Sequence, residues 1–185
     1  RIIAHHSTIS RNARFTVLQF FILHRAYLTP QKNNKIFPLA QASCPRCNDP
    51  RADLCHMIWS CPSLRQFWLN VLRRLKQATG LSLPPEWGTC ALGQFPRDKH
   101  TKARNRFLDL SLLLAKRAVT RRWKAHPPPT IEGWSRSVIS LATAESTILR
   151  SEELWGLRKY PIAEKWDTIL IEFQTTADEA SSQTV

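Results

Sequence analysis

The spacing of four Cys and His residues constrains this chain more than any other feature of its sequence. Cys44, Cys47, His56 and Cys61 follow the pattern C-x2-C-x8-H-x4-C. A C-x2-C turn can direct two thiolates at one metal ion, and a later His and Cys complete a tetrahedron. Because four protein ligands leave no position open for water, we expect one structural Zn²⁺ that folds the segment and catalyses nothing.

Cys55 directly precedes His56 and offers a competing ligand, which would give four cysteines with a C-x5-C second arm. That second arm has a less usual spacing, so the residues themselves favour His56. Alternatively, the cysteines are buried free thiols or members of a disulfide framework. Four cysteines lie close together and Cys90 lies alone, in a sequence where we find no secretory signal. This pattern disfavours disulfides and favours a reducing compartment.

Charge is the second strong constraint, because it is unevenly distributed along the 185 residues. The net charge is +13, but residues 1–126 carry 22 basic and 5 acidic side chains, whereas residues 127–185 carry 5 and 9. A field of that size attracts polyanions, so nucleic acid is the first candidate partner. No apolar run approaches the roughly 20 residues that span a membrane, and we expect no membrane partner.

The hydrophobic pattern predicts a mostly α fold, in which a small CCHC zinc-binding finger packs on an irregular helical bundle. The clearest amphipathic helix follows Pro62, with an apolar face formed by Leu64, Phe67, Trp68, Val71, Leu72 and Leu75. The predicted segments are an N-terminal helix and basic connector (1–43), the finger and its following helix (44–80), a Pro/Gly linker (81–96), a C-terminal helical region (97–174) and a disordered tail (175–185).

Basic residues on and around the finger are the candidate phosphate contacts. The stretch Arg121-Arg122-Trp123-Lys124 combines cations with an aromatic ring, a pattern suited to phosphate contact with base stacking. A core position for Trp123 is an equally good interpretation. The predicted nucleic-acid-binding set is Arg46, Arg51, Arg65, Arg73, Arg74, Arg117, Arg121, Arg122 and Lys124.

Catalytic motifs are missing from the sequence. There is no Gly-rich phosphate loop, G-x-S-x-G, H-E-x-x-H or paired aspartates of the polymerase Y-x-D-D type. We therefore expect a chain that is not an enzyme and has no small-molecule substrate.

Several stretches together resemble one known family. In chain order they are H-R-A-Y-L-T-P-Q, C-P-R-C, L-C-H-M-I-W-S-C-P-S-L-R-Q-F-W, L-L-L-A-K-R-A-V-T-R-R-W-K, P-P-P-T-I-E-G-W and E-K-W. They resemble the carboxyl-terminal zinc-binding segment of LINE-type non-LTR retrotransposon reverse transcriptases, and they run in that family's order. The resemblance extends from about Tyr27 to Phe173 and is most specific at the finger.

The resemblance implies binding of the element's RNA, possible contact with target DNA, and a position after the polymerase part of a longer protein. It assigns the metal ligands to Cys44, Cys47, His56 and Cys61, not to Cys55. The polymerase and endonuclease catalytic residues have no counterpart here. Such a ribonucleoprotein component is expected in the nucleus and cytoplasm and is not secreted. A scaffold that packs on the polymerase, or a decayed copy of the element, are the alternatives.

Overall fold

The chain folds into helices joined by irregular loops. A computed structural model describes residues 13–97, 100–125, 127–157 and 161–182, the last five by their backbone only. The helices in this part are α2 (Ala13–Leu23), α3 (Pro30–Ile36), the π-helix η1 (His56–Ser60), α4 (Pro62–Thr79), α5 (Trp87–Leu92), α6 (Lys102–Arg121), α7 (Ile131–Leu154) and α8 (Ala163–Ser182). No strand occurs in these ranges, which confirms the predicted mostly α class.

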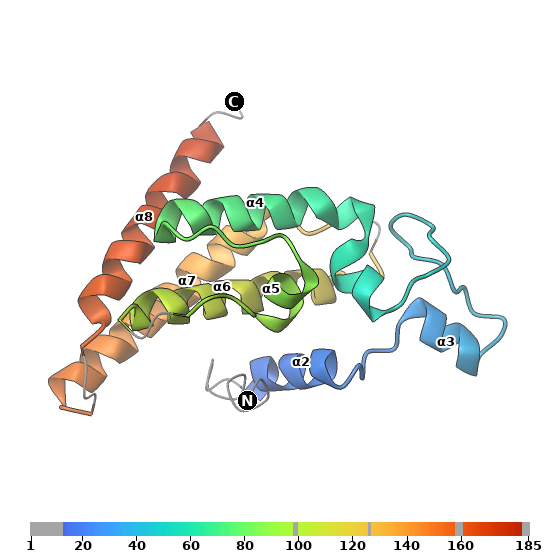
Figure 1. Cartoon of the computed structure of the whole chain (residues 1–185), viewed down its shortest axis with the longest axis horizontal. Coiled ribbons are helices and arrows are strands. Elements are labelled where there is room, and N and C mark those ends of the chain that lie inside the picture. Colours follow the sequence, from blue (N-terminus) through green and yellow to red (C-terminus); the bar gives the residue numbers. More distant parts are fainter. Residues whose placement is uncertain (1–12, 98–99, 126, 158–160, 183–185) are drawn as a thin grey trace.

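Helices α4, α6, α7 and α8 pack together as the main bundle. In Figure 1, α8 crosses the left-hand ends of α4 and α7, while α3 and the loop after it lie at the opposite end of the molecule. Aromatic rings fill the centre of the bundle, where Phe107 and Phe173 meet at 5.6 Å between ring centroids and Trp134 and Phe173 at 5.5 Å. The Trp134 indole donates to Ser111 O, so its polar atom is satisfied inside the core.

The amphipathic pattern after Pro62 is confirmed by α4. Pro62 occupies the first turn, where a missing N–H costs nothing, and Gly80 ends the helix with φ +70. All six apolar residues predicted for this face are buried: Leu64, Phe67, Trp68, Val71, Leu72 and Leu75. The helix starts at the residue after Cys61 and thus connects the Cys/His segment directly to the bundle.

Arg74 does not lie on the exposed face of α4, where a phosphate contact was expected. It is 7% exposed and donates to the Ser135 hydroxyl and to the backbone carbonyls of Thr176 and Ala177. The guanidinium also lies 6.0 Å from the ring centroid of Phe173. Arg74 therefore ties α4 to α7 and α8, and its predicted role in phosphate binding is wrong.

Two segments predicted to lack regular structure contain helix in their described residues, and residues 183–185 of the tail lie outside the described part of the chain. The predicted disordered tail continues α8 as far as Ser182, because Ala177 is buried and two tail carbonyls accept hydrogen bonds from Arg74. The predicted Pro/Gly linker contains α5, whose residues Thr89 and Cys90 are buried. Both predictions failed because tertiary contacts outweigh weak local propensity.

The predicted basic connector also contains a short helix, α3, capped by the Thr29 hydroxyl accepting from Lys32 N. Of the predicted N-terminal segment 1–43, residues 1–12 lie outside the described part of the chain.

Lys116 on α6 is a second buried cation. It is 1% exposed, and its Nζ donates to Gln19 Oε1 on α2 at 2.9 Å and to Ala91 O on α5 at 3.2 Å. Burial lowers the pKa of Lys116 to about 7, because the charged form loses its hydration. The neighbouring Cys90 thiol is buried as well, and burial raises its pKa. Lys116 therefore joins α2, α5 and α6.

We predict that Arg74→Ala lowers the free energy of unfolding by about 3 kcal/mol, because it removes charge-assisted hydrogen bonds to two other helices. The matched control is Arg73→Ala, which removes a guanidinium group from the exposed neighbouring position. This substitution should change the free energy of unfolding by less than about 0.5 kcal/mol. Urea unfolding measures both. Equal effects of the two substitutions would contradict the role assigned to Arg74.

We predict a pH dependence of stability that comes from Lys116. Between its folded pKa of about 7 and the ordinary value of 10.5, the unfolded chain binds a proton that the folded chain does not. Stability should therefore rise with pH in this window, by up to about 1.4 kcal/mol per unit. Urea unfolding from pH 7 to 10 should show a smaller rise for Lys116→Met. The exposed control Lys76→Met should keep the wild-type slope, and an unchanged slope for Lys116→Met would refute the prediction.

Candidate metal centre

The four predicted ligands lie together in the structure. One ligand atom from each of Cys44, Cys47, His56 and Cys61 falls within 4.8 Å of all the others. The Sγ atoms of Cys44 and Cys61 are 3.9 Å apart, those of Cys47 and Cys61 are 3.7 Å apart, and Cys47 Sγ lies 3.3 Å from His56 Nε2. Tetrahedral coordination with 2.3 Å metal–sulfur bonds places thiolates about 3.8 Å apart. These residues could therefore hold one metal ion.

A tight turn brings the first two ligands together. The N–H of Cys44 donates to Asp49 O, and the N–H of Asn48 donates to Cys44 O. Asn48 has φ +60, a left-handed conformation that Asn adopts more readily than most residues. Asp49 then accepts from the backbone N–H of Arg51 at 2.8 Å and continues the reversal. The turn-forming residues of this loop thus direct Cys44 and Cys47 to the same side.

The second pair of ligands is brought together by the π-helix η1. In an α-helix, residues five apart point roughly 140° away from each other around the axis. Here the N–H of Cys61 donates to His56 O at 3.1 Å, which closes a wider i to i+5 turn between the two ligands. The H-x4-C spacing is therefore compatible with one site because the backbone takes π geometry at this point. The sequence pattern alone did not predict this turn.

The surroundings of His56 suit a neutral imidazole ligand. Its Nε2 faces Cys47, while Nδ1 lies 3.9 Å from a carboxylate oxygen of Asp49, on the opposite side of the ring. Burial lowers the pKa of His56, so the ring is neutral at pH 7 and Nε2 can donate its lone pair to a metal. The Asp53 carboxylate accepts from the backbone N–H of His56 at 2.8 Å and fixes the start of the turn. A carboxylate beside the outer nitrogen is the usual support of a metal-bound histidine.

The pKa values of two ligand thiols, Cys47 and Cys61, are shifted in opposite directions. Burial raises the pKa of Cys47 to about 11, so this thiol keeps its proton near neutral pH unless a cation replaces it. Burial alone would raise the pKa of Cys61. Hydrogen bonds to its sulfur, of which the one from the backbone N–H of Ser63 has the largest effect, outweigh burial and lower this pKa. Cys61 is the N-cap of α4, where helix N–H groups favour a thiolate.

Arg46, between the first two cysteines, is buried and is not an exposed phosphate contact. It is 7% exposed and its Nη1 donates to Met57 O at 2.9 Å. Its Nε and Nη2 atoms are buried without a hydrogen-bond partner among the described residues. Three thiolates around a divalent ion carry one net negative charge, which a buried guanidinium nearby would offset. The prediction that Arg46 neutralises phosphate is therefore corrected, and its burial suits a loaded metal centre.

Other predicted site residues lie outside the cluster. Cys55 is half-buried and does not belong to the group of four, in agreement with the preference for His56. Arg51 is exposed and pairs with Asp49 at 3.5 Å, and Arg65 and Arg73 are exposed on α4. The remaining predicted contacts lie at the C-terminal end of α6 and in the turn after it: Arg117, which is half-buried, and Arg121, Arg122 and Lys124, which are exposed.

The fold and the site together define a mostly helical protein with a Cys₃His cluster able to hold a metal ion. No protein-family model matches the sequence. Within the described residues, no helix is both long enough and apolar enough to cross a membrane.

We predict about one bound metal ion per chain in protein purified under reducing conditions. Cys44→Ser should lose the ion and unfold the segment, because metal binding supplies much of the folding energy of such small sites. Cys55→Ser is the matched control and should keep the ion, with a loss of stability under about 1 kcal/mol. Elemental analysis with thermal unfolding measures both. Retention of the ion by Cys44→Ser and its loss from Cys55→Ser would show that the assigned ligand set is wrong.

Proposed function

We propose that this chain is a zinc-dependent nucleic-acid-binding module with RNA as its first partner, and that it corresponds to the C-terminal part of a LINE-type reverse transcriptase. In this proposal zinc is the ion held by Cys44, Cys47, His56 and Cys61, and the finger packs on the helical bundle through α4. The module itself catalyses no reaction. The polymerase part of the parent protein and the nicked target DNA are further partners.

One observation carries the proposal: a hollow between the end of α6 and the start of α7 has three arginines in its wall. The pocket has a volume of about 160 Å³ and is lined by Arg117, Arg121 and Arg122 together with Thr130 and Gly133. In the part of the chain that the structure describes, no acidic residue lines it. Three arginines among the lining residues favour an anion of phosphate size.

Electrostatics at this hollow support the same ligand class. Burial, followed by the like charges of Arg121 and Arg14, lowers the pKa of Arg117. Arg117 and Arg121 both line the hollow, and an anion there would reduce the repulsion between them. The first turn of α7 begins here, with the Thr130 hydroxyl accepting from Gly133 N, and a helix N-terminus adds positive potential.

The exposed cations near the metal cluster support a second part of the same surface. Arg51 lies in the loop between the ligand pairs, with its side chain 86% exposed. Arg65 and Arg73 lie on the exposed side of α4, the helix that begins at the last ligand. Fixing the ligands therefore also fixes the positions of these cations relative to one another.

Exposed apolar side chains favour the scaffold as the second candidate function. Val17 and Phe20 on α2 are 50% and 51% exposed, and Phe37 after α3 is 60% exposed. Large exposed apolar side chains are suited to contact with another protein surface. In this alternative the chain packs on the polymerase and binds RNA only indirectly.

We predict that the metal-loaded protein binds a short single-stranded RNA with an affinity that falls steeply as salt increases. Arg121→Ala with Arg122→Ala should weaken binding and reduce the slope of log K against log salt by about 0.7 for each lost phosphate contact. Fluorescence anisotropy of labelled RNA over a salt series measures both quantities.

The control is Arg150→Ala with Lys165→Ala, which removes the same charge from exposed positions on α7 and α8. This pair should leave the slope unchanged. If RNA does not bind even at low salt, the proposal fails and the scaffold is favoured. If both double variants weaken binding equally, the effect is one of net charge and the hollow is not a site.

A further inference from the structure

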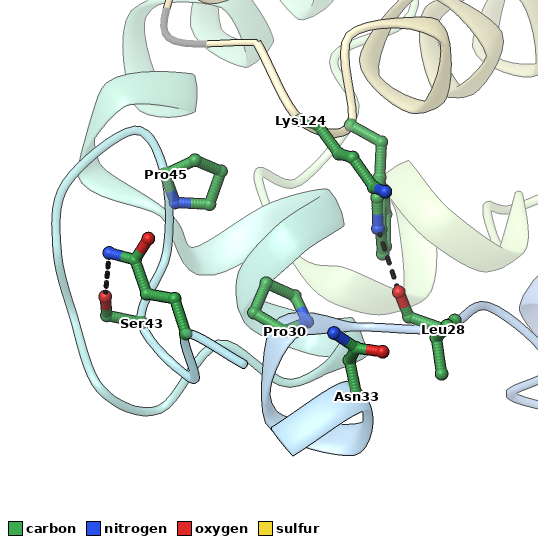
Figure 2. A pocket seen from close by; sticks show the side chains of 8 residues that line it. Leu28, Pro30, Asn33, Ser43, Pro45 and Lys124 are labelled. Carbon is green, nitrogen blue, oxygen red and sulfur yellow. Dashed lines mark hydrogen bonds between the residues drawn. The ribbon is translucent and has the colours of Figure 1, made fainter. Parts of the chain in front are cut away.

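A second pocket lies between the α2–α3 connection, the loop before the first metal ligand and the turn after α6 (Figure 2). Its volume is about 290 Å³, just below the range of pockets for drug-sized molecules, and therefore suited to a single ring system. Its wall combines apolar, amide, hydroxyl and ammonium groups: Leu28, Pro30, Asn33, Gln41, Ser43, Pro45, Trp123 and Lys124.

The indole of Trp123 forms a fixed aromatic wall of this pocket. Its Nε1 donates to Leu28 O at 3.3 Å, and its ring stacks on Tyr27 with 4.9 Å between centroids and 28° between planes. Tyr27 is not among the lining residues, so the part of the indole that lines the pocket is not the part covered by Tyr27. Trp123 thus packs against Tyr27 and also lines the pocket.

Polar groups in the pocket can read the edge of a planar ligand. The Asn33 side chain makes no hydrogen bond within the described part of the chain, so its amide donor and acceptor are both available. Gln41 Nε2 donates to Ser43 Oγ at 2.8 Å, which orients the Gln41 side chain and leaves its carbonyl oxygen as an acceptor. Amide donors and acceptors beside an aromatic wall match the hydrogen-bonding edge of a nucleobase.

The charge at the rim of the pocket favours a nucleotide over an uncharged ring. Lys124 lines the pocket and is exposed, so its ammonium group can meet a phosphate. The preceding residues Arg121 and Arg122 line the hollow between α6 and α7 described above. The two pockets are therefore lined by consecutive residues of one short turn. A strand with a base in this pocket could place an adjoining phosphate near these arginines.

From this arrangement we infer that the Trp123 pocket binds one unpaired base of a single-stranded RNA, stacked on the indole and read by Asn33 and Gln41, with Lys124 on its phosphate. The inference rests on the proposed function, since it names the base-contacting part of the same surface. It adds a contact that depends on the base and not on the phosphate backbone.

The test compares a short single-stranded RNA with an otherwise identical strand that lacks bases. The metal-loaded protein should bind the strand with bases about tenfold more tightly, as expected for stacking of one base on an aromatic ring. Trp123→Leu should abolish this preference and leave the affinity for the abasic strand unchanged. Anisotropy at fixed salt measures both affinities.

The matched control is Trp155→Leu, which removes the same ring from a position that is 74% exposed at the end of α7. It should keep the tenfold preference. Thermal unfolding identifies any loss of folding in Trp123→Leu. If that variant is unfolded, Asn33→Ala decides instead, because it keeps the indole and should lower the preference severalfold.

The outcomes separate this inference from the proposed function. Tight, salt-sensitive binding that is equal for both strands overturns the base pocket and leaves the proposed function standing. Absence of binding to either strand overturns both. An unchanged preference in folded Trp123→Leu, or in Asn33→Ala if the first variant does not fold, also overturns the assignment of the pocket.

Discussion

The close approach of Cys61 to Cys44 and Cys47 is the constraint on which the rest of the structure depends. Between residues 37 and 53 the chain forms no helix and contains few apolar side chains that could hold it in place. Two ligands within this loop and two that follow it nevertheless lie within 4.8 Å of one another. Because α4 starts at the next residue, the position of Cys61 also determines where the longest apolar face near the loop enters the bundle.

Several of the basic side chains that give the sequence its positive charge are buried and cannot contact a polyanion at the surface. Arg46, Arg74 and Lys116 all lie in the basic part of the sequence, and all three are buried with hydrogen bonds to other elements. Arg74 and Lys116 join segments that are distant in sequence, and Arg46 joins the turn of the first two ligands to η1, so some of the basic residues stabilise the fold. The charge available for a polyanion is therefore smaller than the sequence suggests, and it includes the exposed Arg51, Arg121 and Arg122.

Local patterns were predictable from the sequence, and long-range contacts were less so. The ligand set and the apolar face of α4 follow from short spacings, and both agree with the structure. Burial of Arg74 could also have been inferred from spacing, because it follows Phe67 and Val71 at seven and three residues, on the apolar stripe. The helical tail and α5 depend on partners far along the chain, which no local pattern reveals. The π turn between His56 and Cys61 contains one residue more than an α-helical turn, and the local sequence pattern does not reveal it.

The contact between Arg74 and the carbonyls of Thr176 and Ala177 bears on where this module ends. From the sequence, the border of the folded region falls at residue 174, before both acceptors. A chain shortened at that border would keep the guanidinium inside the helix interface beside the Ser135 hydroxyl, and would remove two of the carbonyl groups that accept its hydrogen bonds. The last turns of α8 are thus part of the module's minimal folding unit.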